Sequence, residues 1–514
     1  MLQPIEDKGM STTTLEPMED DFPVDHDEKV LVSLGYKQEF KREFSLWTSF
    51  CVSFAVLGLL PSFASTLFYG MGYAGTAVYH MAYSDVRSCS GGLYYASAVL
   101  APPGWGPVAS WVTGWSSWIG QVTGAPSVNY SAAAMILAAR SITDPNYEQT
   151  KWELFLLTTF LMLIQSCISS MPTKWIAMFN SLGSSFNMVV VIIVIVLIPT
   201  AATTNPKFTP SRQVWGTIKN GTDFPDSIAI LMSFISVMWA MSGFDAPFHL
   251  SEECAIADVA SPRAIVLTSA IGGIFGWVLQ VVVAYTVVDI GAVIDSDLGQ
   301  PWATYLLQVL PQKAALATLA LTIIAGFSMG QGCMVAASRV TYAYARDGCF
   351  PMSRFWRKVN RHTKTPVNAV WLNCTVGVLL CLLIFARETA ILAIFSVGAI
   401  ACFVAFTIPI SLRVFFVGNR FRRGPWHLGN FGKPIGAAAV AFVVLMVPIL
   451  CLPPLIGSNL NSANMNWTCL VYGGPMLIAL FWFAIDARKW YKGPRVNAKH
   501  AMIGQVIKEL GREV

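Results

Sequence analysis

The chain has 514 residues, of which 54% are hydrophobic and only 12% are charged. Soluble proteins carry about 25% charged residues, so this composition excludes a soluble globular protein and indicates a polytopic membrane protein. The formal net charge of +5 does not indicate a nucleic-acid partner, because the basic residues lie in loops between apolar segments, where they set membrane topology. The eleven cysteines form no CxxC or Cys/His cluster, so we expect no metal, no disulfide framework and no cofactor.

The sequence predicts a tail over residues 1–44, a transmembrane domain over 45–486 and a second tail over 487–514, with both tails in the cytoplasm. In the first tail, Glu16–Glu28 holds seven acidic residues in thirteen positions, a composition typical of disorder. No apolar region precedes it, so we expect no cleavable signal peptide.

Eleven apolar segments have the ~20 residues that a membrane-spanning helix needs. In chain order they are Ser45–Phe68, Pro107–Leu137, Trp152–Met171, Trp175–Pro199, Ile228–Leu250, Ile265–Val288, Ala314–Val340, Pro366–Ala386, Thr389–Leu412, Pro434–Leu455 and Trp467–Ile485. A twelfth span would have to lie in Tyr69–Gly92, which holds His80, Asp85 and Arg87. An Asp or Arg at a helix centre costs ~2.5–3.5 kcal/mol on insertion, so this segment is predicted to insert only marginally.

Loop charges predict the orientation of the chain. Arg346–Lys364, Arg413–Lys433 and Arg488–Lys499 are rich in Lys and Arg, which assigns them to the cytoplasm. Asp289–Asp297 has three acids and no base, and Gly457–Asn466 is uncharged, so both are predicted to face out. The C-terminus is then inside, and so is the N-terminus if twelve spans exist.

The outward loop Thr200–Ser227 contains the sequon Asn220-Gly221-Thr222. Sequons also occur by chance, so a glycosylated and an unmodified Asn220 are equally compatible with the sequence. We expect the plasma membrane as the location, with the vacuolar membrane as the alternative.

The apolar run Ile228–Leu250 is interrupted by Gly243 and Pro247, with Asp245 between them. Backbone groups freed by such a break cannot face lipid and must line a cavity, and an acid at membrane depth is a functional-site candidate. The alternative is a proline kink in which Asp245 caps the second half-helix.

The first span is interrupted in the same way, by Gly58 and Pro61. Two Gly/Pro-interrupted spans, five apart in a twelve-span count, indicate inverted repeats with a substrate site near the midplane. The alternative is two unrelated kinks, because Gly and Pro are common in membrane helices.

Seven stretches of the chain carry a family resemblance: Leu34–Ser45 (LGYKQEFKREFS), Val56–Ser65 (VLGLLPSFAS), Ser90–Gly106 (SGGLYYASAVLAPPGWG), Gly243–Glu253 (GFDAPFHLSEE), Ser338–Pro351 (SRVTYAYARDGCFP), Gly424–Gly429 (GPWHLG) and Ala487–Pro494 (ARKWYKGP). They resemble fungal GABA permeases, which belong to the amino acid/choline transporter branch of the amino acid–polyamine–organocation superfamily. The resemblance implies an all-α, LeuT-like fold of 5+5 inverted repeats plus two C-terminal spans. It also implies secondary active transport of amino acids, GABA, polyamines or choline in a lipid bilayer, with a proton as the coupling cation.

The chain departs from this family between Thr76 and Ser90. Members of the family have a full second span before the SGG turn, whereas this chain offers only Tyr69–Ser90. A shortened gene model or a splice variant would produce such a segment, and a genuine adaptation is the alternative. We therefore expect poor folding and low transport for the chain as written.

The two breaks supply the predicted substrate site. Backbone N–H groups at both breaks, helped by the Ser62 hydroxyl, are expected to bind a carboxylate. Asp245 is expected to bind an ammonium, and Trp239 and Phe244 to form a lid or a wall. The predicted substrate-binding residues are Gly58, Leu59, Leu60, Pro61, Ser62, Trp239, Ser242, Gly243, Phe244 and Asp245.

Three residues at the cytoplasmic end of the broken span, His249, Glu252 and Glu253, are the candidates for coupling and gating. Histidine side chains exchange protons near neutral pH in general, so His249 is a proton-relay candidate. The alternative is a gate latch that pairs with basic residues such as Arg339 or Arg346.

Other aromatic and polar side chains inside the spans have two readings. Trp111, Trp115 and Trp118 share one helix face and could contact a cation, although helix packing is the commoner role of such tryptophans. Polar positions could contact substrate or bond between helices. These positions are Gln121, Asn129, Ser328, Gln331 and Ser396.

The sequence therefore predicts a secondary transporter for GABA or related amino acids. A choline or polyamine permease is the alternative within transport, and a non-transporting membrane sensor or inactive product is the alternative outside it. No Ser/His/Asp, metal or phosphate-loop constellation supports an enzyme. Acids do not recur within the spans as a channel filter requires.

Overall fold

The computed structural model describes residues 44–74, 92–204, 207–216, 218–254, 257–386, 388–417, 429–462 and 464–494. These ranges are helical, and the one β-bridge among them joins Phe44 to Cys254. The longer helices are α2 (Leu46–Leu57), α3 (Leu59–Ala74), α4 (Gly92–Leu100), α5 (Gly106–Thr143), α6 (Lys151–Ser169), α7 (Thr173–Ala201), α9 (Asp226–Ala240), α11 (Ala257–Thr286), α13 (Pro301–Val309), α14 (Gln312–Arg346), α16 (Val367–Cys381), α18 (Glu388–Ser411), α19 (Gly432–Leu450) and α20 (Thr468–Trp482). The shorter ones include α8 (Ser211–Gly216), α10 (Ala246–His249), α12 (Ile290–Ile294), α15 (Ser353–Trp356), α17 (Leu383–Ala386) and α21 (Arg488–Trp490).

Nine helices within the described ranges are long and apolar enough to cross a membrane. The broken helix α9–α10 and the 38-residue α5, which is rich in small polar side chains, account for the other two predicted spans. All eleven predicted apolar segments are therefore helical. The doubtful second span falls largely on residues 75–91, which lie outside the described residues, as do most of the two predicted tails.

Local sequence signals explain where many spans begin. Ser45 and Thr150 each close a capping box, with Thr48 and Glu153 respectively, which satisfies amides that the first turn leaves without a partner. Other spans begin directly after a proline, whose fixed φ and missing N–H suit the position before a helix. These prolines are Pro172, Pro225, Pro311 and Pro366.

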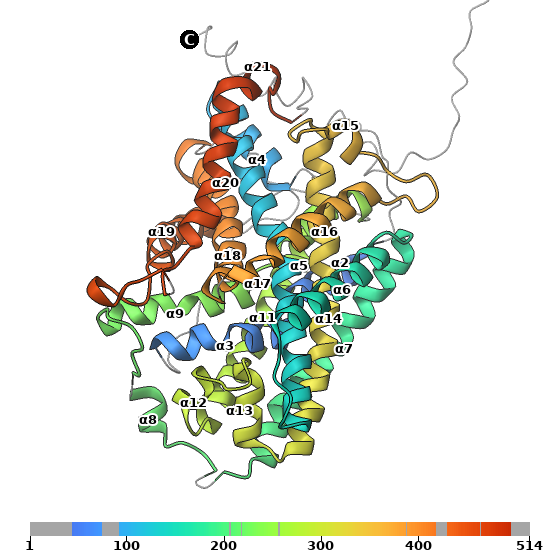
Figure 1. Cartoon of the computed structure of the whole chain (residues 1–514). Coiled ribbons are helices and arrows are strands. Elements are labelled where there is room, and N and C mark those ends of the chain that lie inside the picture. Colours follow the sequence, from blue (N-terminus) through green and yellow to red (C-terminus); the bar gives the residue numbers. More distant parts are fainter. Residues whose placement is uncertain are drawn as a thin grey trace, which may run out of the picture.

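Both broken spans turn at a left-handed glycine. Gly58 separates α2 from α3 with φ +47°, and Gly243 lies in the turn between α9 and α10 with φ +87°. Only glycine adopts such angles without steric cost. The outer halves, α3 and α9, pack against each other and lie side by side in Figure 1.

The packing of the other spans repeats in two halves. In this repeat α5 corresponds to α14 and α6 corresponds to α16. The α5–α6 contact is matched by α14–α16, and the α6–α14 contact is matched by α16–α5. Likewise α7 contacts α14 as α18 contacts α5. These matched pairs are what two inverted repeats of five spans produce, and α19 and α20 add to α18 outside them. The predicted all-helical, polytopic fold is confirmed.

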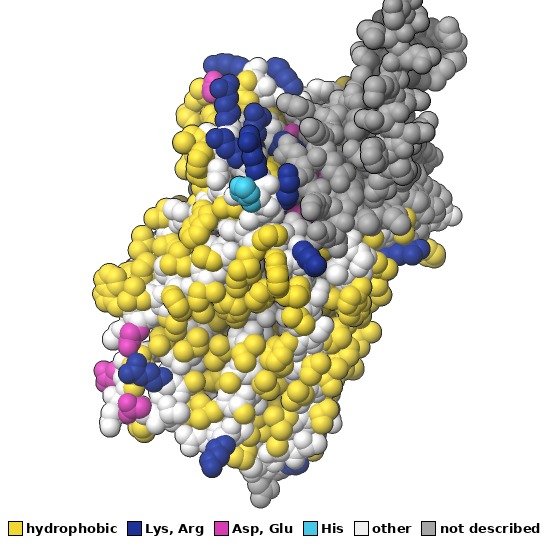
Figure 2. Space-filling model, turned by 90° about the vertical axis from the view of Figure 1, so that its right-hand side faces the viewer, with side chains coloured by type: hydrophobic (Ala, Val, Ile, Leu, Met, Phe, Trp, Pro, Cys, Tyr) yellow, Lys and Arg dark blue, Asp and Glu magenta, His cyan; other side chains and the backbone are white. Residues whose placement is uncertain are grey.

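The two ends of the molecule differ in charge. In Figure 1, α15 and α21 lie at one end, and α8, α12 and α13 lie at the other. Figure 2 shows hydrophobic side chains across the middle of one face and a group of Lys and Arg side chains toward its top. α15 and α21 belong to the basic loops predicted to be cytoplasmic, whereas α12 belongs to the acidic loop predicted to face out.

Candidate functional site

The break in the sixth predicted span brings Asp245 to the centre of the helix bundle. α9 ends at Ala240, a turn covers Met241–Asp245, and the short helix α10 follows. Asp245 occupies the residue before α10, but its side chain makes no capping hydrogen bond. The alternative in which this carboxylate caps the second half-helix is therefore wrong in this structure.

The Asp245 side chain is 1% exposed. Its Oδ2 accepts a 3.3 Å hydrogen bond from Nε2 of Gln121 on α5 and lies 2.9 Å from Nε2 of His249. Its Oδ1 has no hydrogen-bond partner. A buried carboxylate oxygen without a partner carries a large desolvation cost, so this atom is available to a cationic donor.

Trp239 lies one and a half turns before Asp245, at the end of α9. It is 3% exposed, and its indole N–H has no hydrogen-bond partner. Its ring meets Phe395 of α18 edge to face, with 5.1 Å between centroids. Phe244 instead contacts Phe406 of the same helix at 5.1 Å. Trp239 and Phe244 thus each pack against a phenylalanine ring of α18.

The first break is more closely packed than the sequence suggested. The Met329 side chain of α14 fills the space beside Cα of Gly58. The Ser62 hydroxyl donates a 2.7 Å hydrogen bond to the carbonyl of Leu57 and contacts Sδ of Met329 at 3.4 Å. The predicted carboxylate contact of this hydroxyl therefore competes with its hydrogen bond across the break to the last residue of α2. Leu59 and Leu60 lie in the first turn of α3, where amides have no intrahelical acceptor.

The two breaks are joined directly. The Ser53 hydroxyl of α2 donates a 2.9 Å hydrogen bond to the Phe244 carbonyl. The Val56 side chain fills the space beside Gly243. Each left-handed glycine thus leaves room for a side chain of another span close to the backbone. These contacts hold the predicted carboxylate-binding segment next to the predicted ammonium-binding segment.

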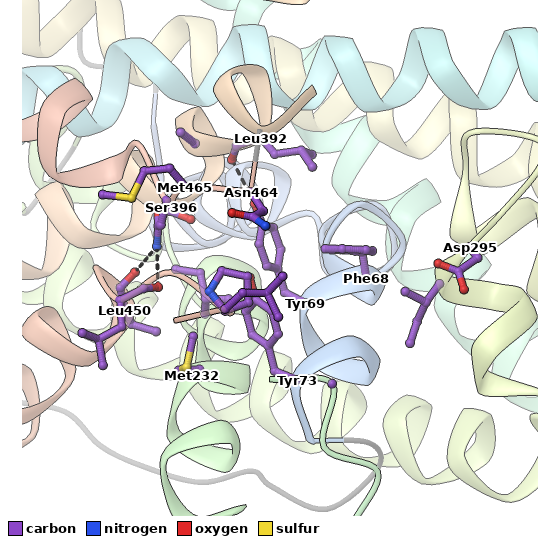
Figure 3. A pocket seen from close by; sticks show the side chains of 18 of the residues that line it. Phe68, Tyr69, Tyr73, Met232, Asp295, Leu392, Ser396, Leu450, Asn464 and Met465 are labelled. Carbon is purple, nitrogen blue, oxygen red and sulfur yellow. Dashed lines mark hydrogen bonds between the residues drawn. The ribbon is translucent and has the colours of Figure 1, made fainter. Parts of the chain in front are cut away.

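A cavity of about 600 Å³ opens on the outer side of the breaks. Figure 3 shows Phe68, Tyr69 and Tyr73 of α3 along it and Asp295 at its far side; Tyr69 donates a 3.1 Å hydrogen bond to the Leu392 carbonyl. The cavity is lined by Phe68, Tyr69, Tyr73, Gly221, Met232, Ile235, Ile294, Asp295, Ser296, Leu392, Ala393, Ser396, Leu450, Leu452, Pro454, Leu455, Asn464, Met465 and Asn466.

The cavity stops short of Asp245. On α9 its lining includes Met232 and Ile235, and Trp239 follows one turn closer to the break. On α18 it includes Leu392 and Ser396, which flank Phe395. The Trp239–Phe395 pair therefore packs between α9 and α18 next to this part of the cavity lining.

Two buried ion pairs close the inner side. Arg339 of α14 binds Glu253 through both oxygens, at 2.8 and 3.3 Å, and Arg346 binds Glu252 at 2.8 Å. The amide of Phe44 adds a 2.9 Å hydrogen bond to the Glu253 carbonyl. Burial raises the pKa of the Glu252 carboxyl, and the guanidinium of Arg346 opposes this shift. In this conformation the two acids pair with the two arginines that the gating alternative names.

The remaining candidates divide between packing and contact roles. The indole N–H of Trp111 donates to the Ala479 carbonyl, and its ring contacts Trp482 and Tyr491. The amides of Asn129 and Gln165 bond to each other. Other polar positions are occupied as follows: Gln331 donates to Ser169, Ser328 donates to the Ile324 carbonyl of its own helix, and Ser396 lines the outer cavity.

Asn220 is held by its own loop. Its amide nitrogen, the atom that a glycan would modify, donates to the Phe224 carbonyl at 2.7 Å and to Asp226 at 3.0 Å. Thr222 donates back to the Asn220 side-chain oxygen at 2.8 Å. The sequon is thus folded into a hydrogen-bonded turn beside the start of α9.

Sequence reasoning missed Met329, Phe395 and the aromatic lining of the outer cavity. Met329 gave no signal, because one methionine in an apolar span is ordinary. Tyr69 and Tyr73 were separable in principle, since aromatic residues four apart share a helix face. Both lie in Tyr69–Gly92, where the polar residues obscure the pattern of a span.

Comparisons with known proteins agree with this geometry. A family model described as amino acid permease matches residues 44–475. An uncharacterized amino-acid permease of Schizosaccharomyces pombe is 55% identical over 510 residues, covering 95% of this chain and 94% of the relative. A protein of Candida albicans named as a candidate polyamine transporter is 43% identical, covering 96% and 94%. Amino-acid permease BAT1 of Arabidopsis thaliana is 30% identical, covering 91% and 96%.

These matches extend over nearly the whole chain. The relatives are transporters rather than enzymes, and multi-pass membrane proteins by their family. This chain belongs to the amino acid permease family.

Proposed function

We propose that this permease carries GABA or a related amino acid across the plasma membrane, with the substrate ammonium bound by Asp245. The observation that carries the proposal is the buried Oδ1 of Asp245, which has no partner. An ammonium supplies N–H donors and a positive charge, and charge-assisted hydrogen bonds of this kind are about twice as strong as neutral ones.

The carboxylate of such a substrate finds donors in the same region. The first-turn amides of α3, at Leu59 and Leu60, lie at the positive end of a helix dipole. The indole N–H of Trp239 is buried without a partner and offers a further donor at the outer side of the break. We assign Trp239, with Phe395 behind it, as the wall that separates bound substrate from the outer cavity.

Coupling to protons is the second part of the proposal. His249 lies 2.9 Å from the carboxylate that would bind the substrate, and imidazole exchanges protons near neutral pH. A proton and an ammonium would therefore act on one carboxylate. Substrate release would follow when the latch formed by Glu252, Glu253, Arg339 and Arg346 opens.

A polyamine is the second candidate substrate. The 43% identical relative from Candida albicans is named as a candidate polyamine transporter. The outer cavity also combines the aromatic rings of Phe68, Tyr69 and Tyr73 with the carboxylate of Asp295, and both groups attract amines. Choline fits less well, because a quaternary ammonium has no N–H to donate to Asp245.

The test is uptake of radiolabelled GABA, putrescine and choline in cells that express the chain, normalised to the folded protein in the membrane. Asp245→Asn keeps the shape of the side chain and removes its charge, so we expect uptake to fall to background. Asp486→Asn is the matched control, because Asp486 is exposed and pairs only with exposed Lys489 among the described salt bridges. Normal uptake by well-folded Asp245→Asn would refute both the binding and the coupling role.

A further inference from the structure

Two cysteines meet where the last two spans approach each other. Cys451 is the first residue after α19, and Cys469 is the second residue of α20. Sγ of Cys469 lies 4.0 Å from the carbonyl oxygen of Cys451, and the two thiols are hydrogen-bonding neighbours. Both thiols are free in this structure. Because the side chains are already in contact, their sulfur atoms need only a short movement to reach the ~2.05 Å of a disulfide bond.

One asparagine holds the backbone on both sides of this pair. The Asn466 amide nitrogen donates to the carbonyls of Leu450 at 2.9 Å and Leu452 at 3.0 Å, which flank the first cysteine. Its side-chain oxygen accepts a 3.1 Å hydrogen bond from the amide of Thr468, which directly precedes the second cysteine. The end of α19 and the start of α20 are therefore fixed next to each other by this one side chain.

Loop charges place the pair on the outer side. The basic segment Arg413–Lys433 precedes α19, and the basic segment Arg488–Lys499 follows α20, which predicts a cytoplasmic position for both segments. The opposite ends of the two helices, where the cysteines lie, then face out together with the uncharged loop Gly457–Asn466. A membrane protein exposes this side to the oxidising lumen of the secretory pathway, where disulfides form and persist.

We propose that Cys451 and Cys469 form a disulfide bridge that fastens the loop between α19 and α20 beside the outer cavity. The eleven cysteines are scattered along the chain, so the sequence gave no sign of this pair. It is the packing of the end of α19 against the start of α20 that brings the two thiols together.

The bridge forms by thiol–disulfide exchange with a dithiol–disulfide oxidoreductase of the secretory pathway. Cys469 is exposed, whereas Cys451 is half-buried, so the Cys469 thiolate attacks the disulfide of the oxidoreductase first. One sulfur of the oxidoreductase leaves, and a mixed disulfide remains. The Cys451 thiolate then attacks the Cys469 sulfur, and the second sulfur leaves. Two cysteine thiols are oxidised, one disulfide of the oxidoreductase is reduced to a dithiol, and that dithiol takes up the two protons.

The bridge closes a ring that carries one wall of the outer cavity, part of which is visible in Figure 3. On its other edge this wall is held by Asp223, whose Oδ2 accepts a 3.0 Å hydrogen bond from the Ile456 amide and whose own amide donates to the Pro454 carbonyl at 3.0 Å. The covalent bond thus fastens one edge, and hydrogen bonds fasten the other. The ring residues that line the cavity are Leu452, Pro454, Leu455, Asn464, Met465 and Asn466.

The first test looks for the bond in the full-length wild type. Cells that express the chain are lysed in N-ethylmaleimide, which blocks free thiols, and the purified protein is digested and analysed by mass spectrometry with and without reductant. We expect a linked pair of peptides that contains Cys451 and Cys469 and disappears on reduction. This readout needs no variant and no transport, so it is independent of the substrate.

The second test measures the melting temperature of the detergent-solubilised protein with and without reductant. A disulfide restricts the unfolded chain, so reduction should lower the melting temperature of the wild type by several degrees. Cys451→Ser and Cys469→Ser should each remove this response to reductant. Cys167→Ser is the matched control, because Cys167 is also exposed but lies near the inner end of α6; it should keep both the linked peptides and the response.

Three results would overturn the proposal. Alkylated Cys451 and Cys469 in the unreduced wild type would show that no bridge forms. A link found only in a reducible dimer on a gel, or a link to another cysteine, would exclude this pairing within one chain. Linked peptides with an unchanged melting temperature on reduction would show that the bond does not fasten the loop.

Discussion

At the two breaks, Gly58 and Asp245 each meet more than one structural requirement. Gly58 must adopt a left-handed conformation and must also leave room for Met329. Asp245 must stay buried while one oxygen bonds to Gln121 and His249 and the other remains without a partner. A substitution at either position therefore changes structure and function together, and a useful experiment has to separate the two.

For Gly58, the structure changes the expected result of the simplest substitution. Gly58→Val should lower the yield of folded protein, because a branched side chain at φ +47° is strained by ~1–2 kcal/mol and meets Met329. Shortening Met329 to Ala in the same chain should recover part of this loss. The measurement is the monodisperse peak of the detergent-solubilised protein in size-exclusion chromatography.

The double variant Gly58→Ala with Met329→Ala then tests carboxylate binding at this break. If Leu59 and Leu60 hold the carboxylate, its apparent affinity for GABA should fall several-fold relative to Met329→Ala alone. Unchanged GABA affinity in folded protein would argue against a carboxylate site there, and the first break would then serve packing alone.

At the scale of elements, helix ends hold the inner side closed. The end of the sixth span bonds to Phe44 before α2 and to two arginines on α14. Cys254 lies beside this latch, is 1% exposed and contacts Ser49 Oγ of α2 at 3.2 Å. Opening the inner side therefore requires three segments to separate, and it would expose a thiol that is now covered.

This arrangement predicts the effect of Glu253→Gln. Removing one partner of a buried ion pair destabilises the paired state by ~3–5 kcal/mol, so the inner side should open more often and Cys254 should react faster with a thiol reagent. The measurement is the alkylation rate in a background where Cys254 is the only cysteine. Arg339→Gln should act in the same direction, and Asp486→Asn should not; an unchanged rate in both latch variants would contradict the gating role.

At the scale of the whole molecule, α3 ends near the outer side of the protein, and the described chain resumes at α4 near the inner side. Tyr73 lines the outer cavity, whereas Gly92 lies beside His249 on the inner side. This placement agrees with an even number of crossings and with both termini inside. The number of membrane crossings, and therefore the side of the N-terminus, depends on whether the connection between Thr76 and Ser90 crosses the membrane.

We therefore keep the prediction that the chain as written folds poorly and transports slowly. His80, Asp85 and Arg87 stand where the resemblance to GABA permeases implies an apolar span, and an Asp or Arg near a helix centre costs ~2.5–3.5 kcal/mol on insertion. A variant with a full apolar span between Thr76 and Ser90 should give more folded protein and faster uptake. Accessibility of single cysteines at Ala74, Ala82 and Ser88 checks the topology. Robust uptake by the unmodified chain, with these sites protected, would show that the suspicion is unfounded.

The sequence by itself determined the helical class, the eleven apolar spans, both breaks and their glycines, and the presence of an acid in the second break. These features are local: span length, helix breakage and loop charge depend on neighbouring residues and on the bilayer. The Asp245 carboxylate was recognised for the same reason, because few other acids lie inside an apolar run.

Only the tertiary structure decided which side chains meet. Glu253 and Arg339 are far apart in the chain, and either acid could have paired with either arginine until α14 was placed against the end of the broken span. Met329 at Gly58 depends in the same way on which helix faces pack together. Such contacts are set by the matched packing of the two repeats, and no local pattern of residues encodes that packing.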